Sequence, residues 1–149
     1  MSTRVVMTST SEKYFERYNG MPVPPIKENM ETFNAGSISI GVEFRVLNDR
    51  LTEALGVKEI AAANGYPTLD DYGVSLHVFV KTPEGNFERL RFDCFNNDPH
   101  YHYFSVTGKW QDVLHIDRNV AGDPLAWAMN LIRTRLLPML HRADVVNPG

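Results

Sequence analysis

The sequence is poor in features that define several large classes of proteins. It has a single cysteine, Cys94, so no disulfide can form within the chain, which fits a reducing compartment. No apolar run approaches the roughly 18 residues that a membrane helix needs, and residues 1–11 lack the long apolar core of a secretion signal. These absences predict a cytoplasmic protein that does not insert into a membrane.

Positive charge is scarce as well. The chain has 15 lysines and arginines against 18 aspartates and glutamates, a formal net charge of -3, and its basic residues form no cluster. Because phosphate binding requires a basic face, this composition argues against a nucleic-acid partner. The length of 149 residues and the hydrophobic fraction of 43% suit one globular domain with a sizeable core.

Alternation of apolar and polar residues predicts the strands. In residues 37–47, isoleucine, valine and phenylalanine alternate with smaller or polar residues, as in a strand with one buried face. Three further strands are expected at residues 74–82, 86–95 and 100–107, and a fifth at residues 112–117. Short polar turns join the middle strands, so the predicted sheet is antiparallel and has four or five strands.

The turn Pro83-Glu84-Gly85 sets the register between the second and third predicted strands. Proline suits the first central position of a type I turn, and glycine suits the left-handed position that follows. Together they predict a three-residue hairpin loop that pairs Thr82 with Asn86. Counting along both strands then places His77 opposite Arg91.

Helix signals occur in three regions. Residues 9–12 have the spacing of a capping box and predict a helix that ends near residue 19. A second helix is expected within residues 48–63. Asp123-Pro124 has aspartate at the cap and proline at the first helical position, and opens a long helix with a broad apolar stripe.

The expected fold is therefore α+β. Residues 1–36 are predicted to form an N-terminal helix and a proline-rich arm, and residues 37–149 a single α+β domain. In that domain a four- to five-stranded antiparallel sheet carries the long C-terminal helix on its apolar face.

The stretch Leu90–Tyr103, LRFDCFNNDPHYHY, supplies the candidate site. Residues two apart on a strand point the same way, so His100 and His102 lie on one side of the sheet. A four-residue loop at residues 96–99 would place Asp93 opposite His102 on that same side.

These residues suggest a metal site. Two imidazoles on one side of a strand, with Asp93 and His77 on neighbouring strands, form a candidate ligand set for a divalent ion such as zinc or iron: His100, His102, Asp93 and His77. Arg91 could hold an anionic substrate beside it. The first hypothesis is thus a metal-dependent enzyme that acts on an anionic or oxygenated small molecule.

Two other hypotheses stay open on the sequence. In a metal-free enzyme, Asp93 would orient His102 for proton transfer, with Arg91 as the third catalytic residue. In a non-catalytic module, the polar face or the proline-rich arm would meet a second copy, which predicts a homodimer. Cys94 falls on the apolar side and is interpreted as a packed thiol.

The chain resembles a family of small bacterial proteins of unknown function in two places. These are the block Leu90–Tyr103, above all its run from FDCF to PHYHY, and the C-terminal pattern Asp123-Pro124...Trp127...Arg133...Arg135-Leu136...Pro138-Met139-Leu140. The resemblance covers the last two-thirds of the chain. It implies a recurring domain and brings no assigned catalytic residues.

Overall fold

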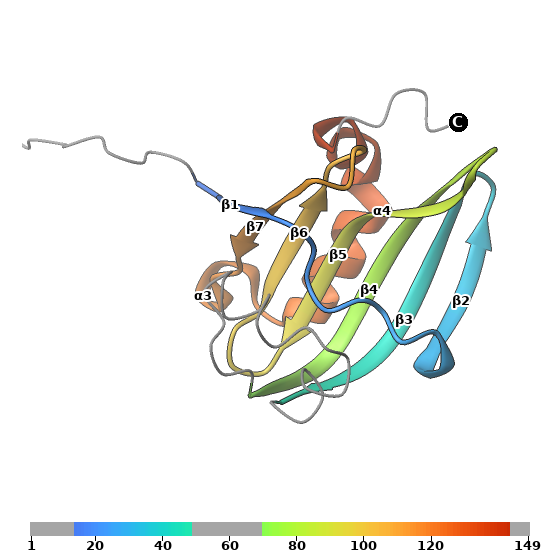
Figure 1. The fold of residues 1–149 in the computed structure, drawn as a ribbon. Coiled ribbons are helices and arrows are strands. Elements are labelled where there is room, and N and C mark those ends of the chain that lie inside the picture. The colour runs from blue at the N-terminus through green and yellow to red at the C-terminus, as the bar shows by residue number, and fades with distance from the viewer. Residues whose placement is uncertain (1–13, 49–69, 144–149) are drawn as a thin grey trace, which may run out of the picture.

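One antiparallel sheet of seven strands dominates the protein (Figure 1). The computed structural model describes residues 14–48 and 70–143. Across the sheet the strands lie in the order β1-β7-β6-β5-β4-β3-β2. Their bounds are Glu16–Asn19 (β1), Met30–Ala35 (β2), Ile38–Leu47 (β3), Asp71–Thr82 (β4), Gly85–Phe95 (β5), His100–Phe104 (β6) and Trp110–His115 (β7).

The expected α+β fold with four or five strands is wrong, because the protein is mostly β and two edge strands were not predicted. β1, where the capping-box argument predicts helix, pairs with β7. β2 pairs with β3, although five of its six residues are exposed and it shows no apolar alternation. Tyr14 and Phe15, the described residues before β1, are not helical either. The earlier part of the first predicted helix, and nearly all of the second, lie outside the described residues.

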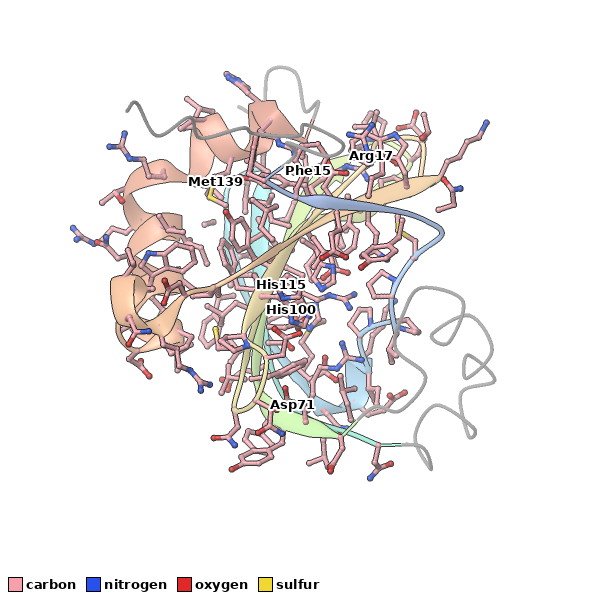
Figure 2. The ribbon with its side chains drawn as sticks, turned by 90° about the vertical axis from the view of Figure 1, so that its left-hand side faces the viewer. Phe15, Arg17, Asp71, His100, His115 and Met139 are labelled. Carbon is pink, nitrogen blue, oxygen red and sulfur yellow. The ribbon has the colours of Figure 1, made fainter. Side chains whose placement is uncertain are left out.

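A helix covers one face of the sheet. Asp123 caps α4 (Pro124–Arg142) by accepting a hydrogen bond from the backbone N–H of Ala126 at 2.9 Å. The helix continues through Pro138, which the sequence predicts to kink or end it. Figure 2 shows Met139 on this side of the sheet, and its neighbours in the core include Ala128, Leu140, Val78, Leu90 and Phe92. A four-residue helix, α3 (Arg118–Ala121), precedes α4. Within the described residues, no helix is long and apolar enough to cross a membrane.

The opposite face is polar, and it is buried too. Residues 20–29, here called the N-terminal strap, run from β1 to β2 across this face and end in the short 3-10 helix η1 (Lys27–Asn29) (Figure 1). The polar residues beneath are all buried: Ser39, Glu43, Arg45, Ser75, His77, Arg91, Asp93, His100 and His102. The strap contains Pro22, Pro24 and Pro25, and because it covers the polar side chains, this face of the sheet is a second interior.

A β-bulge changes the register along the central hairpin, between β4 and β5. At the turn, Thr82 pairs with Gly85 and not with the predicted Asn86. The ladder then shifts between Val78 and Phe79, so that His77 does pair with Arg91. The extra residue of the bulge is Arg89, because Val78 pairs with Leu90 and Phe79 pairs with Glu88.

The next hairpin differs from the expected register by two residues. Asp93 pairs with His100, and Arg91 pairs with His102. Because side chains alternate with a period of two, a shift of two leaves every residue on its predicted face. Asp93 and both histidines therefore still point to the polar side.

Candidate metal centre

Asp93, His100 and His102 meet under the N-terminal strap. β5 supplies the carboxylate, and β6, the adjacent strand, supplies both imidazoles. The Oδ2 atom of Asp93 lies 2.8 Å from Nε2 of His102 and 3.1 Å from Nε2 of His100. One potential ligand atom from each residue lies within 4.8 Å of the others, and all three residues are buried. The structure thus brings together three of the four expected ligands.

The hydrogen bonds of His102 determine which ring nitrogen carries its proton. Nδ1 of His102 lies 2.7 Å from Oε1 of Gln111. The amide nitrogen of Gln111 donates to the carbonyl of Gly20, which can only accept, so Oε1 is correctly the atom that faces the ring. His102 therefore donates its Nδ1 proton to Gln111, and the neutral ring keeps a lone pair on Nε2.

His100 is arranged in the same way. Its Nδ1 lies 2.8 Å from the backbone carbonyl of Asp98, which can only accept a hydrogen bond. Its neutral ring therefore also keeps the lone pair on Nε2. Histidines that bind metals usually donate the other ring N–H to a carbonyl or carboxylate, which fixes the tautomer and the orientation of the ring. Both site histidines meet this condition.

Two lone pairs and a carboxylate oxygen thus converge on one point. Burial opposes ionisation of Asp93, but its hydrogen bonds to His100 and His102 hold its pKa well below the usual range. Burial lowers the pKa of His102, although Asp93 acts to raise it. For His100 burial also acts downward, yet the hydrogen bond to Asp93 raises the pKa. Each of these hydrogen bonds needs a proton on Nε2 of the histidine, because the carboxylate can only accept. Where that proton is absent, the facing atoms are all acceptors, and a metal ion between them would satisfy them.

A small cavity adjoins the three ligand atoms. Its volume is about 60 Å³, and Asp93, His100 and His102 line it together with Arg45 and Phe95, among others. A cavity of this size holds a few water molecules at most. The other oxygen of Asp93 accepts a hydrogen bond from the hydroxyl of Ser75. The hydrogen bond from Ser75 therefore fixes the orientation of the Asp93 carboxylate, whose Oδ2 faces the histidines.

His77, expected among the metal ligands, lies in a second cluster. Arg91 stands between it and His102 in one row across the sheet, which separates the two histidines by two strand spacings, about 10 Å. Nε2 of His77 lies 2.9 Å from Oε1 of Glu43, and Nδ1 contacts Glu88. These carboxylates raise the pKa of His77 even though burial acts to lower it.

Arg91, expected to hold an anionic substrate, is occupied by other groups. Its Nε and Nη2 donate to the two oxygens of Glu88 at 2.8 and 2.6 Å. Its Nη1 donates to the carbonyl of Val23 in the strap at 2.7 Å. Arg45 donates to the same carbonyl, and the backbone N–H of Ile26 donates to Glu43. Arg91 therefore positions Glu88 and the strap.

Glu88 and Gln111 are the site residues that sequence reasoning missed, whereas the expected hairpin register already placed Ser75 opposite Asp93. In a regular strand Glu88 would share the apolar face with Leu90 and Phe92. The bulge at Arg89 reverses the alternation and turns Glu88 toward His77 and Arg91. Gln111 lies on β7, where alternation alone predicts no contact with His102. Neither the orientation of Glu88 nor the contact between Gln111 and His102 can be predicted before the pairing of the strands is known.

The stability of this cluster should depend on Glu88 at acidic pH. Burial opposes ionisation, but Arg91 and His77 lower the pKa of Glu88 to about 2. Such a carboxylate stabilises the fold fully above its unfolded pKa of about 4.5, and the contribution is lost as the pH falls toward 2. We expect Glu88→Gln to weaken the acid dependence of the free energy of unfolding by about 2 kcal/mol between pH 7 and pH 3, because the remainder is lost only below pH 3. Urea unfolding between about pH 7 and pH 3 measures this.

The matched control is Glu84→Gln, which changes an exposed glutamate in the turn before β5. Its acid dependence should equal that of the unchanged protein. If Glu88→Gln also retained the full acid dependence, the ion pair with Arg91 would not form in solution.

The fold and the cluster define a mostly β domain that buries a histidine–aspartate site beneath an N-terminal strap. The profile of the family described as Domain of unknown function (DUF7700) matches residues 32–147, and the chain belongs to this family. The expected membership of an uncharacterised family is thereby confirmed. No curated protein and no solved structure matches the chain at a significant level.

Proposed function

We propose that Asp93, His100 and His102 bind one divalent metal ion, through Oδ2 of the aspartate and Nε2 of each histidine. The observation that carries this proposal is that Nδ1 of each ring faces a hydrogen-bond acceptor, Oε1 of Gln111 for His102 and the backbone carbonyl of Asp98 for His100, which places the Nδ1 protons there. The Nε2 lone pairs are thereby directed at the ionised carboxylate, an arrangement that is repulsive without a cation.

The spacing of the ligand atoms supports the proposal. Ligands that lie about 2.0–2.1 Å from a tetrahedral ion are separated by roughly 3.3 Å. The separations of 2.8 and 3.1 Å from Oδ2 of Asp93 approach that value, so small rotations of the rings suffice. Two histidines and one carboxylate on one side of an ion suit zinc or non-haem iron and leave coordination positions open.

The surrounding charges favour an anionic or oxygenated small molecule as the further ligand. The carboxylates of Glu43, Glu88 and Asp93 face the cations Arg45 and Arg91 and also His77, whose charged form Glu43 and Glu88 favour. A divalent ion added to this balanced set leaves an excess of positive charge, which an anion or a bound hydroxide would neutralise. Bound there, the ion would act as a Lewis acid or lower the pKa of a water molecule.

A metal-free acid/base site is the second candidate, and the same distances favour it. Separations of 2.8 and 3.1 Å are ordinary hydrogen-bond lengths, so one proton on Nε2 of His100 would also satisfy Asp93. The raised pKa of His100 fits that state. In this case Asp93 would orient the imidazole that transfers the proton.

Metal analysis of protein purified without a histidine tag separates the two candidates. We expect about one ion per chain, and His102→Gln should lower the affinity by more than the roughly 10–100-fold effect typical of residues that only orient a ligand. Gln111→Ala, which removes such an orienting group, should fall within that range. The affinity should also decrease as the pH falls, because protons compete for the Nε2 atoms.

His115→Gln provides the control. His115 lies near His100, with ring centroids 6.1 Å apart, but it is half exposed and hydrogen-bonds to Asp98 (Figure 2). Its loss should leave metal binding close to that of the unchanged protein. If protein reconstituted with zinc, or with ferrous iron under anaerobic conditions, held no stoichiometric metal, the metal proposal would be rejected in favour of the metal-free site.

A further inference from the structure

A groove of about 340 Å³ opens on the strap side of the sheet, next to the buried cluster. The strap forms one wall with Met21, Pro22, Pro24 and Pro25, and the ends of β5 and β6 with the turn that follows form the other. Pro22 and Arg91 line both this groove and the cavity beside the histidines. Volumes of this order are typical of small-molecule sites.

The lining of the groove is largely apolar. Phe87 and Val106 are 41% and 47% exposed, and Met21 is 37% exposed. The three prolines have no backbone N–H, so the strap wall offers few hydrogen-bond donors. An apolar body can therefore rest between the strap and the aromatic rings of Phe87 and Phe104.

Arg89 is a polar group of this groove that uses only one of its guanidinium nitrogens, Nη1, in hydrogen bonds within the described residues. Its Nη1 donates to the carbonyl of Ser105 at 3.1 Å, and its guanidinium lies 5.4 Å from the centre of the Phe87 ring. Within residues 14–48 and 70–143, its Nε and Nη2 have no acceptor and no carboxylate forms an ion pair with it. Burial lowers its pKa, and no acidic group offsets that effect.

The bulge accounts for this position. Arg89 is the extra residue that pairs with nothing on β4, and bulges often direct a side chain into a functional site. The neighbouring charges are already paired, because Glu88 binds Arg91 and His77. The Nε and Nη2 edge of Arg89 is thus a fork that remains free for a planar anion.

We propose that this groove binds a small organic acid, with its carboxylate on the Nε and Nη2 edge of Arg89 and its apolar body against Phe87, Phe104 and the prolines of the strap. The inference is independent of the metal proposal, because Arg89 contacts none of the three ligand residues. A ligand in the groove would nevertheless lie beside the metal centre, on the other side of Pro22 and Arg91.

Titration of the ¹⁵N-labelled full chain with hexanoate, benzoate and 3-phenylpropanoate tests the proposal, with the neutral amide of each acid as its matched partner. At millimolar concentrations we expect the acids to shift the backbone resonances of Phe87, Thr107 and Gly108, and the amides to bind more weakly. Arg89→Gln should weaken binding of the acids by about tenfold or more, to the level of the amides.

Arg135→Gln, on the exposed side of α4, is the control and should bind the acids as the unchanged protein does. The proposal is overturned if none of the acids shifts these resonances, or if Arg89→Gln binds the acids as tightly as the unchanged chain. Metal content is measured separately on the same samples, so failure of the groove and failure of the metal centre are distinguishable.

Discussion

Replacing Phe92 with alanine should lower the free energy of unfolding by about 3–5 kcal/mol, the range found for buried aromatic truncations. Phe92 is fully buried between the sheet and α4, and its ring stacks on Tyr101 with centroids 5.7 Å apart. Alanine would leave a cavity in the middle of this layer that the rigid strands cannot close. Chemical unfolding followed by circular dichroism measures the loss.

Trp127→Ala is the comparison, and its loss should be smaller. Trp127 lies on α4 and also contacts Tyr101, with ring centroids 5.6 Å apart, but it is only half-buried. Solvent can therefore fill part of the space that its removal creates. A loss below about 1 kcal/mol for Phe92→Ala would contradict the packing of α4 on this face.

Replacing Arg91 with methionine should be about as damaging, at about 3–5 kcal/mol. Arg91 is 2% exposed, and methionine keeps much of its length while removing the charge. The change leaves the carboxylate of Glu88 buried without its bidentate partner, and it removes one of the hydrogen bonds that hold the strap at Val23. Urea unfolding at pH 7 gives the cost.

A double-mutant cycle with Glu88→Gln identifies the cause. If the cost arises from an uncompensated charge, the double variant should be less destabilised than the sum of the two single variants. Arg135→Met, an exposed change on α4, should stay within about 0.5 kcal/mol of the unchanged protein. Additive costs for Arg91 and Glu88 would show that the two side chains are not coupled.

The faces of the central strands were predictable because alternation has a period of two. Asp93, His100 and His102 fall on one side under both the expected and the observed register, since the two differ by two residues. Which residues lie directly opposite one another on neighbouring strands depends on the register itself. These cross-strand neighbours therefore could not be predicted from alternation alone. His77 shares the predicted face, yet Arg91 separates it from the metal ligands.

Other features of the fold depend on contacts between residues far apart in the chain, which a local sequence pattern cannot predict. β1 and β2 form because free sheet edges are available to them, not because their own residues alternate. The polar face is buried because the strap crosses it, so residues that resemble an exposed surface become a charged interior. Glu88 reaches that interior only through the bulge at Arg89.

The N-terminal strap must be long enough to cross the full width of the sheet. β1 and β2 are joined directly by residues 20–29, yet they lie at opposite edges of the seven-stranded sheet (Figure 1). Crossing from one edge to the other takes about 29 Å at roughly 4.8 Å per strand. The connecting residues span only about 30 Å when extended, with the last turn in 3-10 form.

This connection consequently has almost no slack. Pro22, Pro24 and Pro25 keep it extended, which is the conformation that the span demands. The sheet cannot broaden or flatten without lifting the strap from the carbonyl contacts at Val23 and Pro24. The covalent chain thus limits the curvature of the whole sheet, and a change of shape at either edge is transmitted to the cover of the buried histidines.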